Sequence, residues 1–447
     1  MLRFGTDGVR GVALREITPV AVQHFARAAA RALAFPGVVV GHDPRESSDE
    51  LAHAVAEGFR AEGLDVVYAG MLPTPAVAFL AATTGRAGAV ITASHNPYTD
   101  NGVKVFAAGG RKLSDDQQMA IEAETHRILD EGTGPIRRDL AIGVVMRRSD
   151  GVSEYVDHLV SVFGEGALAG LRVVIDTANG AMSKVAPLVL QRLGADVIVM
   201  NDAPDGTNIN DRCGATSPQS LCEFISGTGT GVSVDLGFAF DGDGDRVIAV
   251  DENGRIVDGD RLIALSAIDR RTSGRLAGNT VVVTVMSNLG FHRAMASAGI
   301  DVVTVPVGDR HVLDAMESGH FELGGEQSGH IIHRDRATTG DGLLAAIETC
   351  LLLGRSGSRF SQIAAAVMHT YPQVLKNVRV AQSPDDVAVA LADEIAAEQA
   401  LLGVNGRVLV RASGTEPLIR VMVEAGTAEL ANEVADRLVA AAVRRFA

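Results

Sequence analysis

Three aspartates alternate with glycines in the middle of the chain, at Asp241, Asp243 and Asp245. The glycines allow the backbone to turn sharply, so three carboxylates can converge on one hard cation. Magnesium is the cation that best suits phosphate chemistry. Arg246 follows directly, and its guanidinium could hold a phosphate close to the ion. A solvated acidic turn is the alternative that this segment alone leaves open.

A serine much earlier in the chain, Ser94, follows an apolar run at residues 89–91 and precedes His95-Asn96-Pro97. This turn-forming sequence predicts a hydroxyl at a loop tip. Such a hydroxyl could accept a phosphoryl group and later return it, which divides one transfer into two. An ordinary turn serine is the alternative. The sequence has no Gly-x-Ser-x-Gly motif, which argues against an α/β-hydrolase nucleophile.

A segment near the carboxyl end combines two guanidinium groups, two hydroxyls and a backbone donor. These groups belong to Arg411, Ser413, Gly414, Thr415 and Arg420. They suit a phosphate dianion that is held without being transferred. An exposed turn with surface arginines is the alternative.

A fourth, glycine-flanked loop carries Glu326, Ser328 and His330, whose donors and acceptors suit the vicinal hydroxyls of a sugar. Satisfied polar residues of an ordinary loop would look the same. Lys104 and Arg10 are cations near predicted loop ends, where they could assist proton transfer or hold phosphate. Taken together, the four loops predict a phosphoryl-transfer enzyme.

The elements that position these loops form a unit that recurs three times. Each unit has an apolar strand, a helix that ends at a glycine, and a second strand. The first strands are predicted at residues 38–40, 173–175 and 281–285, the glycines are Gly63, Gly194 and Gly299, and the second strands lie at 66–67, 197–198 and 302–303. A further apolar run in each unit leads into Ser94, Asp241 or Gly325. Ligands collect at the carboxyl ends of strands in open α/β sheets, so the loops are expected to share a cleft.

The last part of the chain differs from these units. It predicts strands at 377–380, 407–410 and 419–424, and helices through 385–398 and from 428 onward. We therefore expect an α/β protein with three similar α/β domains, whose mixed, mainly parallel sheets surround a central cleft, plus a C-terminal α+β domain. The predicted domains are residues 1–150 with the serine loop, 151–251 with the metal loop, 252–369 with the sugar loop and 370–447 with the phosphate loop.

Composition narrows the class of partner. The 447-residue chain has a formal net charge of -15, which opposes binding to nucleic acid or to an anionic membrane and favours a small-molecule substrate. Its three cysteines show no Cys-x-x-Cys spacing and fit a reducing compartment. The residues after Met1 soon include Arg3, Asp7 and Arg10 in place of an apolar run, and no later stretch has the length of a membrane span. We expect a cytoplasmic protein.

The order and spacing of these motifs resemble the α-D-phosphohexomutase family over essentially the whole chain, from Phe4-Gly-Thr-Asp-Gly8 to the segment 411–420. The resemblance implies that Ser94 is a phosphoserine in the resting enzyme. It also implies that the aspartate triplet holds Mg²⁺, with a phosphate oxygen on Ser94 as a further ligand. A hexose 1,6-bisphosphate would be both the intermediate, which turns end for end, and an activator. The family suggests a homodimer.

The resemblance also assigns roles to the remaining residues. Lys104 and Arg10 would act as general base and electrostatic support, with His95 and His330 near the reacting oxygens; the identity of the base stays open. The segment around Arg411 would hold the distal phosphate. Glu326 and Ser328 would contact a sugar that is presented in two orientations.

Finer features bear on the substrate. Gln327 and the Val-Gly-Asp-Arg run at 307–310 resemble the glucosamine branch of the family, which implies interconversion of glucosamine 6-phosphate and glucosamine 1-phosphate for cell-wall amino-sugar synthesis. Ala412 stands where proline is usual, and His311 where tyrosine is usual. The alternatives are phosphomannomutase or phosphoglucomutase specificity, a metal-dependent sugar phosphatase, and a non-catalytic sugar-phosphate binding protein.

Overall fold

The computed structural model describes residues 4–5, 8–130, 141–227, 233–380, 386–413 and 417–446. The chain divides into two compact units. Residues 1–286 and 300–365 form the first unit, and residues 287–299 and 366–447 form the second. Helix α9 (Leu289–Ser297) therefore belongs to the second unit, although the segments on either side of it in the sequence contribute to the first.

The first sheet of the first unit is mixed. Its strands are β1 (Val9–Val12), β2 (Val38–His42), β3 (Val66–Met71), β4 (Ala87–Ile91), β5 (Asp100–Ala107), β6 (Arg111–Lys112) and β7 (Val145–Arg147). Their order is β1-β5-β4-β2-β3-β7, with β6 paired to β5. The accompanying helices are α1 (Pro19–Leu33), α2 (Ser48–Ala61), α3 (Thr74–Thr84) and α4 (Asp115–Asp130).

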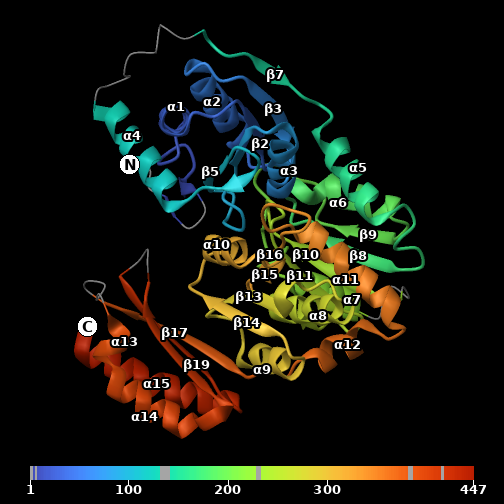
Figure 1. Ribbon diagram of the computed structural model, residues 1–447, viewed down its shortest axis with the longest axis vertical. Helices are drawn as coiled ribbons and strands as arrows, with labels where there is room; N and C mark the ends of the chain where they lie inside the picture. The colour runs from blue at the N-terminus through green and yellow to red at the C-terminus, as the bar shows by residue number, and fades with distance from the viewer. Residues whose placement is uncertain are drawn as a thin grey trace. The chain divides into compact units, whose positions relative to one another are not determined.

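Two further sheets complete the first unit (Figure 1). The second sheet has the order β12-β11-β10-β8-β9 and contains β8 (Arg172–Asp176), β9 (Asp196–Met200), β10 (Leu236–Phe240), β11 (Val247–Asp251) and β12 (Ile256–Val257). The third has the order β14-β13-β15-β16 and contains β13 (Thr280–Thr284), β14 (Asp301–Val305), β15 (Leu323–Gly325) and β16 (Ile331–His333). Their helices are α5 (Gly151–Phe163), α6 (Val185–Arg192), α7 (Gln219–Ser226), α8 (Gly259–Thr272), α10 (Asp309–Gly319), α11 (Gly342–Ser356) and α12 (Phe360–Val367).

The three sheets share one strand pattern. Three neighbouring strands run parallel and a fourth runs antiparallel to the third, in the orders β3-β2-β4-β5, β9-β8-β10-β11 and β14-β13-β15-β16. The predicted threefold repeat is confirmed. The serine, metal and sugar loops each connect the third strand to the antiparallel fourth strand, so one topological position carries the chemistry in all three domains.

Local sequence explains why these units form. The first strand of each unit is buried, as Val38, Val39 and Val40 with no exposed surface illustrate, because helices cover both faces of the sheet. The glycines predicted to end the helices have φ angles of 85° (Gly63), 93° (Gly194) and 63° (Gly299). This left-handed conformation suits glycine and turns the chain from a helix into the next strand.

The second unit is an α+β structure. Strands β17 (Gln373–Arg379), β19 (Leu418–Glu424) and β18 (Arg407–Ala412) form an antiparallel sheet in that order, and α15 (Ala428–Phe446) packs along β17 and β19 (Figure 1). The single helix predicted through 385–398 is instead two helices, α13 (Val387–Ala390) and α14 (Ala392–Leu402). Neither glycine nor proline marks the break, which falls at the fully buried Leu391. Within the described ranges, no helix is both long and apolar enough to cross a membrane.

Candidate active site

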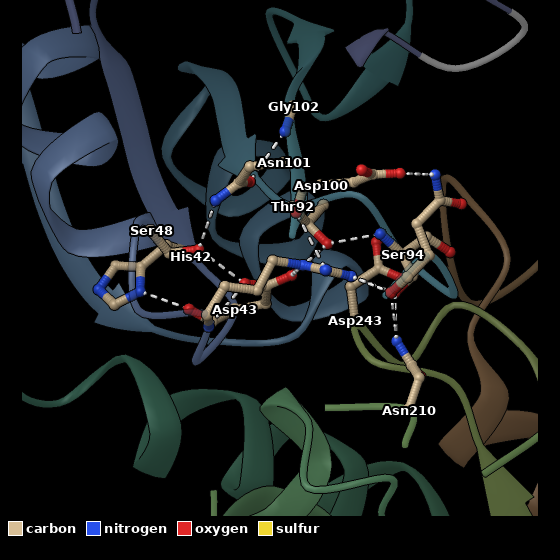
Figure 2. A network of polar contacts seen from close by, with 12 residues as sticks. His42, Asp43, Ser48, Thr92, Ser94, Asp100, Asn101, Gly102, Asn210 and Asp243 are labelled. Carbon is tan, nitrogen blue, oxygen red and sulfur yellow. Dashed lines mark hydrogen bonds and ion pairs between the residues drawn. The ribbon is translucent and has the colours of Figure 1, made fainter. Parts of the chain in front are cut away.

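The Ser94 hydroxyl meets the aspartate triplet directly. Ser94 follows β4 and is almost fully buried, and its Oγ donates a hydrogen bond to Oδ2 of Asp241 at 2.6 Å. The backbone of Ser94 has a φ of 53°, which is uncommon for a residue with a Cβ. Its amide donates to Oγ1 of Thr92 at 2.8 Å (Figure 2). Two loops whose contacting residues are 147 positions apart in the sequence therefore form one site.

Asp241, Asp243 and Asp245 are buried, and one carboxylate oxygen from each lies within 4.8 Å of the others. Lys104, on the antiparallel strand β5, places its ammonium 2.8 Å from Oδ2 of Asp243 and 2.6 Å from Oδ2 of Asp245. Thr74, at the start of α3, donates from its hydroxyl to Oδ2 of Asp243 at 2.6 Å. The triplet is thus anchored by the first domain as well as by its own loop.

The electrostatics of this cluster fit a divalent cation. Burial, together with the Asp245 and Asp243 carboxylates, holds the pKa of Asp241 well above its usual value. Burial alone would also raise the pKa of Asp245, but Lys104 and His330 hold it well below its usual value. Oδ1 of Asp243 is buried and has no hydrogen-bond partner among the described residues. The three buried carboxylates carry more negative charge than the one neighbouring ammonium neutralises. Their oxygens are the hard ligands that Mg²⁺ prefers, and the ion would supply the missing positive charge.

Two histidines flank the cluster, and their pKa values are shifted in opposite directions. Burial, with help from Arg246 and Arg10, lowers the pKa of His95 to about 4, so its ring is neutral near pH 7. Its Nδ1 lies 3.4 Å from Ser94 Oγ. Burial alone would lower the pKa of His330, but Asp245 and Asp309 raise it above its usual value. Neutral His95 can accept a proton, whereas His330 favours donating one.

The other predicted residues of the first unit lie around this centre. The amide of Arg246 donates to Oδ1 of Asp241 at 3.1 Å, and its guanidinium lies 4.0 Å from Asp245. Glu326 is buried and accepts a hydrogen bond from the amide of Gly308 at 3.2 Å. Ser328 is exposed on the same loop.

The sugar loop packs tightly against the metal-loop strand. A Cβ on Gly329, whose φ is 92°, would lie 2.1 Å from the carbonyl oxygen of Val247, so only glycine fits there. Arg10 lies on β1 opposite Gly102 of β5, near enough to His95 to lower the pKa of that ring.

The predicted phosphate segment belongs to the second unit. Arg411 on β18 pairs directly with Arg420 on β19, and Ser413 is buried at the end of β18. Burial and the neighbouring Arg420 guanidinium lower the pKa of Arg411. Gly414 and Thr415 lie outside the described residues.

Sequence reasoning missed several polar partners of the site. Asp309 lies 3.5 Å from Nε2 of His330 and also pairs with Lys112 of β6, and Thr74 binds Asp243. Asp43 and Arg45 lie just after the end of β2, and this position could have identified them as candidate site residues in the sequence. Nothing local distinguishes Lys112 or Thr74 from ordinary surface residues.

Comparison with known proteins places the chain in a family. Models of the phosphoglucomutase/phosphomannomutase alpha/beta/alpha domains I, II and III match residues 1–131, 153–254 and 258–371, and the model of the C-terminal domain matches residues 375–441. The chain belongs to the phosphoglucomutase/phosphomannomutase family. It is therefore an intramolecular phosphotransferase, an enzyme of the isomerase class.

Individual relatives sharpen this comparison. Phosphoglucosamine mutase of Parafrankia sp. (strain EAN1pec) is 47% identical over 97% of this chain and 97% of its own length. The enzyme of the same name from Rhodococcus jostii (strain RHA1) is also 47% identical, over 97% of this chain and 98% of its own length. A phosphoglucomutase/phosphomannomutase family protein from Burkholderia thailandensis has a solved structure with a TM-score of 0.82 at 25% identity, covering 98% and 97% of the two chains.

Proposed function

We propose that this chain interconverts glucosamine 6-phosphate and glucosamine 1-phosphate, through a phosphoserine at Ser94 and a glucosamine 1,6-bisphosphate intermediate. The observation that carries the proposal is the 2.6 Å contact between Ser94 Oγ and Asp241 inside a buried triplet able to hold a cation. The 47% identity to phosphoglucosamine mutases over nearly the full chain supports the choice of sugar. The product would supply amino-sugar precursors for cell-wall synthesis.

Each half-reaction transfers one phosphoryl group. In the first, the bond from Ser94 Oγ to phosphorus breaks and a sugar hydroxyl forms the new bond to phosphorus, giving up its proton to a base. In the second, the Ser94 hydroxyl attacks the other phosphate of the bisphosphate and gives up its own proton. The acceptors within reach of that proton are Oδ2 of Asp241 at 2.6 Å and Nδ1 of His95 at 3.4 Å.

The surrounding charges suit the phosphoryl group in transfer. Lys104 is held as an ammonium between two carboxylates, which favours charge stabilisation over base catalysis in this arrangement. His330, with its raised pKa, and Arg246 add hydrogen-bond donors. Mg²⁺ held by Asp241, Asp243 and Asp245 would neutralise negative charge on the phosphate. Arg411, Ser413, Thr415 and Arg420 would hold the phosphate that is not being transferred, and Glu326 and Ser328 would contact the sugar.

Intact-protein mass spectrometry with phosphosite mapping tests the nucleophile. The wild type should carry one phosphate on Ser94, and Ser94→Ala should lack it and lose turnover by at least about 10³-fold. Ser161→Ala, which removes an exposed hydroxyl on α5, is the matched control and should retain both. An active Ser94→Ala with phosphate on another residue would contradict the assignment.

Initial rates on glucosamine, glucose and mannose phosphates test the specificity. Glucosamine phosphate should give the highest kcat/KM, and an isomeric sugar phosphate should be the product. A preference for mannose or glucose phosphate would assign the chain to another branch of its family. Release of inorganic phosphate in place of the isomer would make it a phosphatase.

Four expectations remain predictions alongside this function. They are activation by a hexose 1,6-bisphosphate, a homodimer, a cytoplasmic location, and domain boundaries near residues 150, 251 and 369. Turnover assays with added bisphosphate would test the activation, and sedimentation analysis would test the homodimer.

A further inference from the structure

A buried arginine lies beneath the loop that carries Ser94. Arg45 donates from Nη2 to the carbonyl oxygens of Ser94 and Asn96, both at 2.9 Å, and from Nη1 to those of Pro97 and Asp100. The remaining donor, Nε, contacts Asp43. Each of the five N–H groups of the guanidinium therefore has an acceptor, and four of these acceptors are backbone carbonyl oxygens within residues 94–100.

Asp43 fixes this arginine in place. Its Oδ2 accepts from Nε of Arg45 at 2.8 Å and from the Thr92 hydroxyl at 2.7 Å, and its Oδ1 accepts from the Ser48 hydroxyl at 2.7 Å. The side chains of both Asp43 and Arg45 are completely buried. Thr92 in turn accepts from the amide of Ser94. The arginine, the aspartate and the loop thus form a closed network at the ends of β2 and β4.

A second donor reaches the same loop from another domain. Asn210, between β9 and α7 of the second sheet's domain, donates from Nδ2 to the carbonyl oxygen of Ser94 at 2.9 Å and to that of Asn96 at 3.1 Å. The Ser94 carbonyl therefore receives hydrogen bonds from both domains that contribute to the catalytic contact. These bonds involve only protein groups, so they can persist whether Ser94 carries a hydroxyl or a phosphate.

This support matters because the backbone of Ser94 is in a costly conformation. A left-handed φ brings the Cβ of a residue too close to its following carbonyl oxygen, and Ser94 has a φ of 53°. A shift of about 1 Å at a reacting group lowers transfer rates by about 100-fold. We propose that Arg45 and Asn210 are positioning residues, which hold the Ser94 backbone so that its side-chain oxygen faces the aspartate triplet in both states of the catalytic cycle.

The proposal rests on the proposed function and is tested with the full-length enzyme. Arg45→Lys keeps the charge but offers three donors in place of five, and Asn210→Ala removes both cross-domain bonds. Each variant should lower kcat for glucosamine 6-phosphate by about 10- to 100-fold, with KM within about threefold of the wild type. The ³¹P resonance of phosphoserine should also shift, because the phosphate sits differently in its surroundings.

Arg27→Lys is the matched control. Arg27 is a buried arginine of α1 that pairs with Glu62 at 2.8 Å in the same domain. This substitution should lower the melting temperature about as much as Arg45→Lys while leaving kcat and the ³¹P resonance unchanged. If Arg45→Lys does not fold, Asn210→Ala alone decides.

Two outcomes would overturn the positioning role. One is a kcat within twofold of the wild type in both variants, and the other is an equal loss of kcat in Arg27→Lys. Both are distinct from failure of the proposed function, which would appear as unimpaired turnover by Ser94→Ala.

Discussion

At the residue scale, Lys104 is the group whose charge decides whether the acidic triplet can stay buried. Its ammonium contacts Asp243 and Asp245 while being almost fully buried itself. Breaking a buried ion pair by removing one partner costs about 3–5 kcal/mol, because the other charge is left uncompensated. A second cation in the triplet would offset part of that cost.

We therefore predict that Lys104→Met makes the stability of the protein depend on magnesium. Its melting temperature should fall well below that of the wild type in EDTA and recover partly with Mg²⁺, and turnover should fall by about 100-fold or more. Thermal denaturation with and without the metal measures the effect. Lys112→Met, which removes one of the two ion-pair partners described for Asp309, should destabilise equally with and without Mg²⁺. The same magnesium response in Lys104→Met and in the wild type would refute the argument.

At the element scale, the register of one hairpin brings two like charges together. Strand pairing sets Arg411 of β18 opposite Arg420 of β19. Like charges directly opposite each other destabilise a sheet, and the lowered pKa of Arg411 reflects both burial and this repulsion. A bound phosphate dianion would turn the repulsion into a shared attraction.

We therefore predict that Arg420→Met does not lower the melting temperature when phosphate is absent, but reduces the stabilisation that phosphate provides. Without phosphate the variant should melt at the same or a higher temperature than the wild type. With saturating phosphate it should gain less stability, and KM for the sugar phosphate should rise by about 10- to 100-fold. Differential scanning calorimetry at two phosphate concentrations measures both. A variant stabilised by phosphate as much as the wild type would exclude Arg420 from the anion site.

The start of α11 offers a pH-dependent test at the same scale. Asp341 caps this helix by accepting from the amide of Leu344, and also accepts from the Tyr155 hydroxyl. Burial raises its pKa to about 6, above the value of about 4 expected in an unfolded chain. The protonated Asp341 side chain therefore contributes fully to the free energy of unfolding below pH 4, and this contribution is lost as the pH rises through 6.

Asp341→Asn removes this titration while keeping a capping side chain. Relative to the wild type, the variant should gain about 2 kcal/mol of stability between pH 4.5 and pH 7.5. Urea unfolding at several pH values measures the difference. A difference that stays constant over this range would show that Asp341 ionises normally in the folded protein.

At the scale of the whole molecule, the division into units does not follow the order of the sequence. Asn288, just before α9, exchanges hydrogen bonds with the backbone of Tyr371 at 2.9 and 3.0 Å, and the amide of Leu289 donates to Glu424 of β19 at 3.0 Å. These contacts tie a short internal segment to the C-terminal α+β structure.

Asn288→Ala should accordingly loosen the second unit. Leaving the buried groups of Tyr371 unpaired costs about 1–3 kcal/mol. Hydrogen exchange in the full-length protein should accelerate at Tyr371 and in β19, and stay unchanged in β13 and β14, the sequence neighbours of α9. Asn432→Ala, an exposed change on α15, is the control and should leave both regions unchanged. Faster exchange in β13 in place of β19 would contradict the division.

The sequence by itself determined the parts of this protein that depend on near neighbours. Apolar runs located the parallel strands, glycines located the helix ends, and the alternation of aspartate and glycine located the triplet, because backbone conformation and apolar character are encoded within a few residues. The order of motifs was also enough to predict the fold class and the family.

Only the tertiary structure decided which distant groups meet. It alone brings Ser94 within 2.6 Å of Asp241 and sets Arg45 and Asn210 against the serine loop. It also groups α9 with the C-terminal unit. In the sequence, Arg45 stands just after a strand but nothing shows which groups it contacts, and Asn210 looks like any loop asparagine. Their roles arise from burial and long-range hydrogen bonds, which depend on how sheets from separate segments pack together.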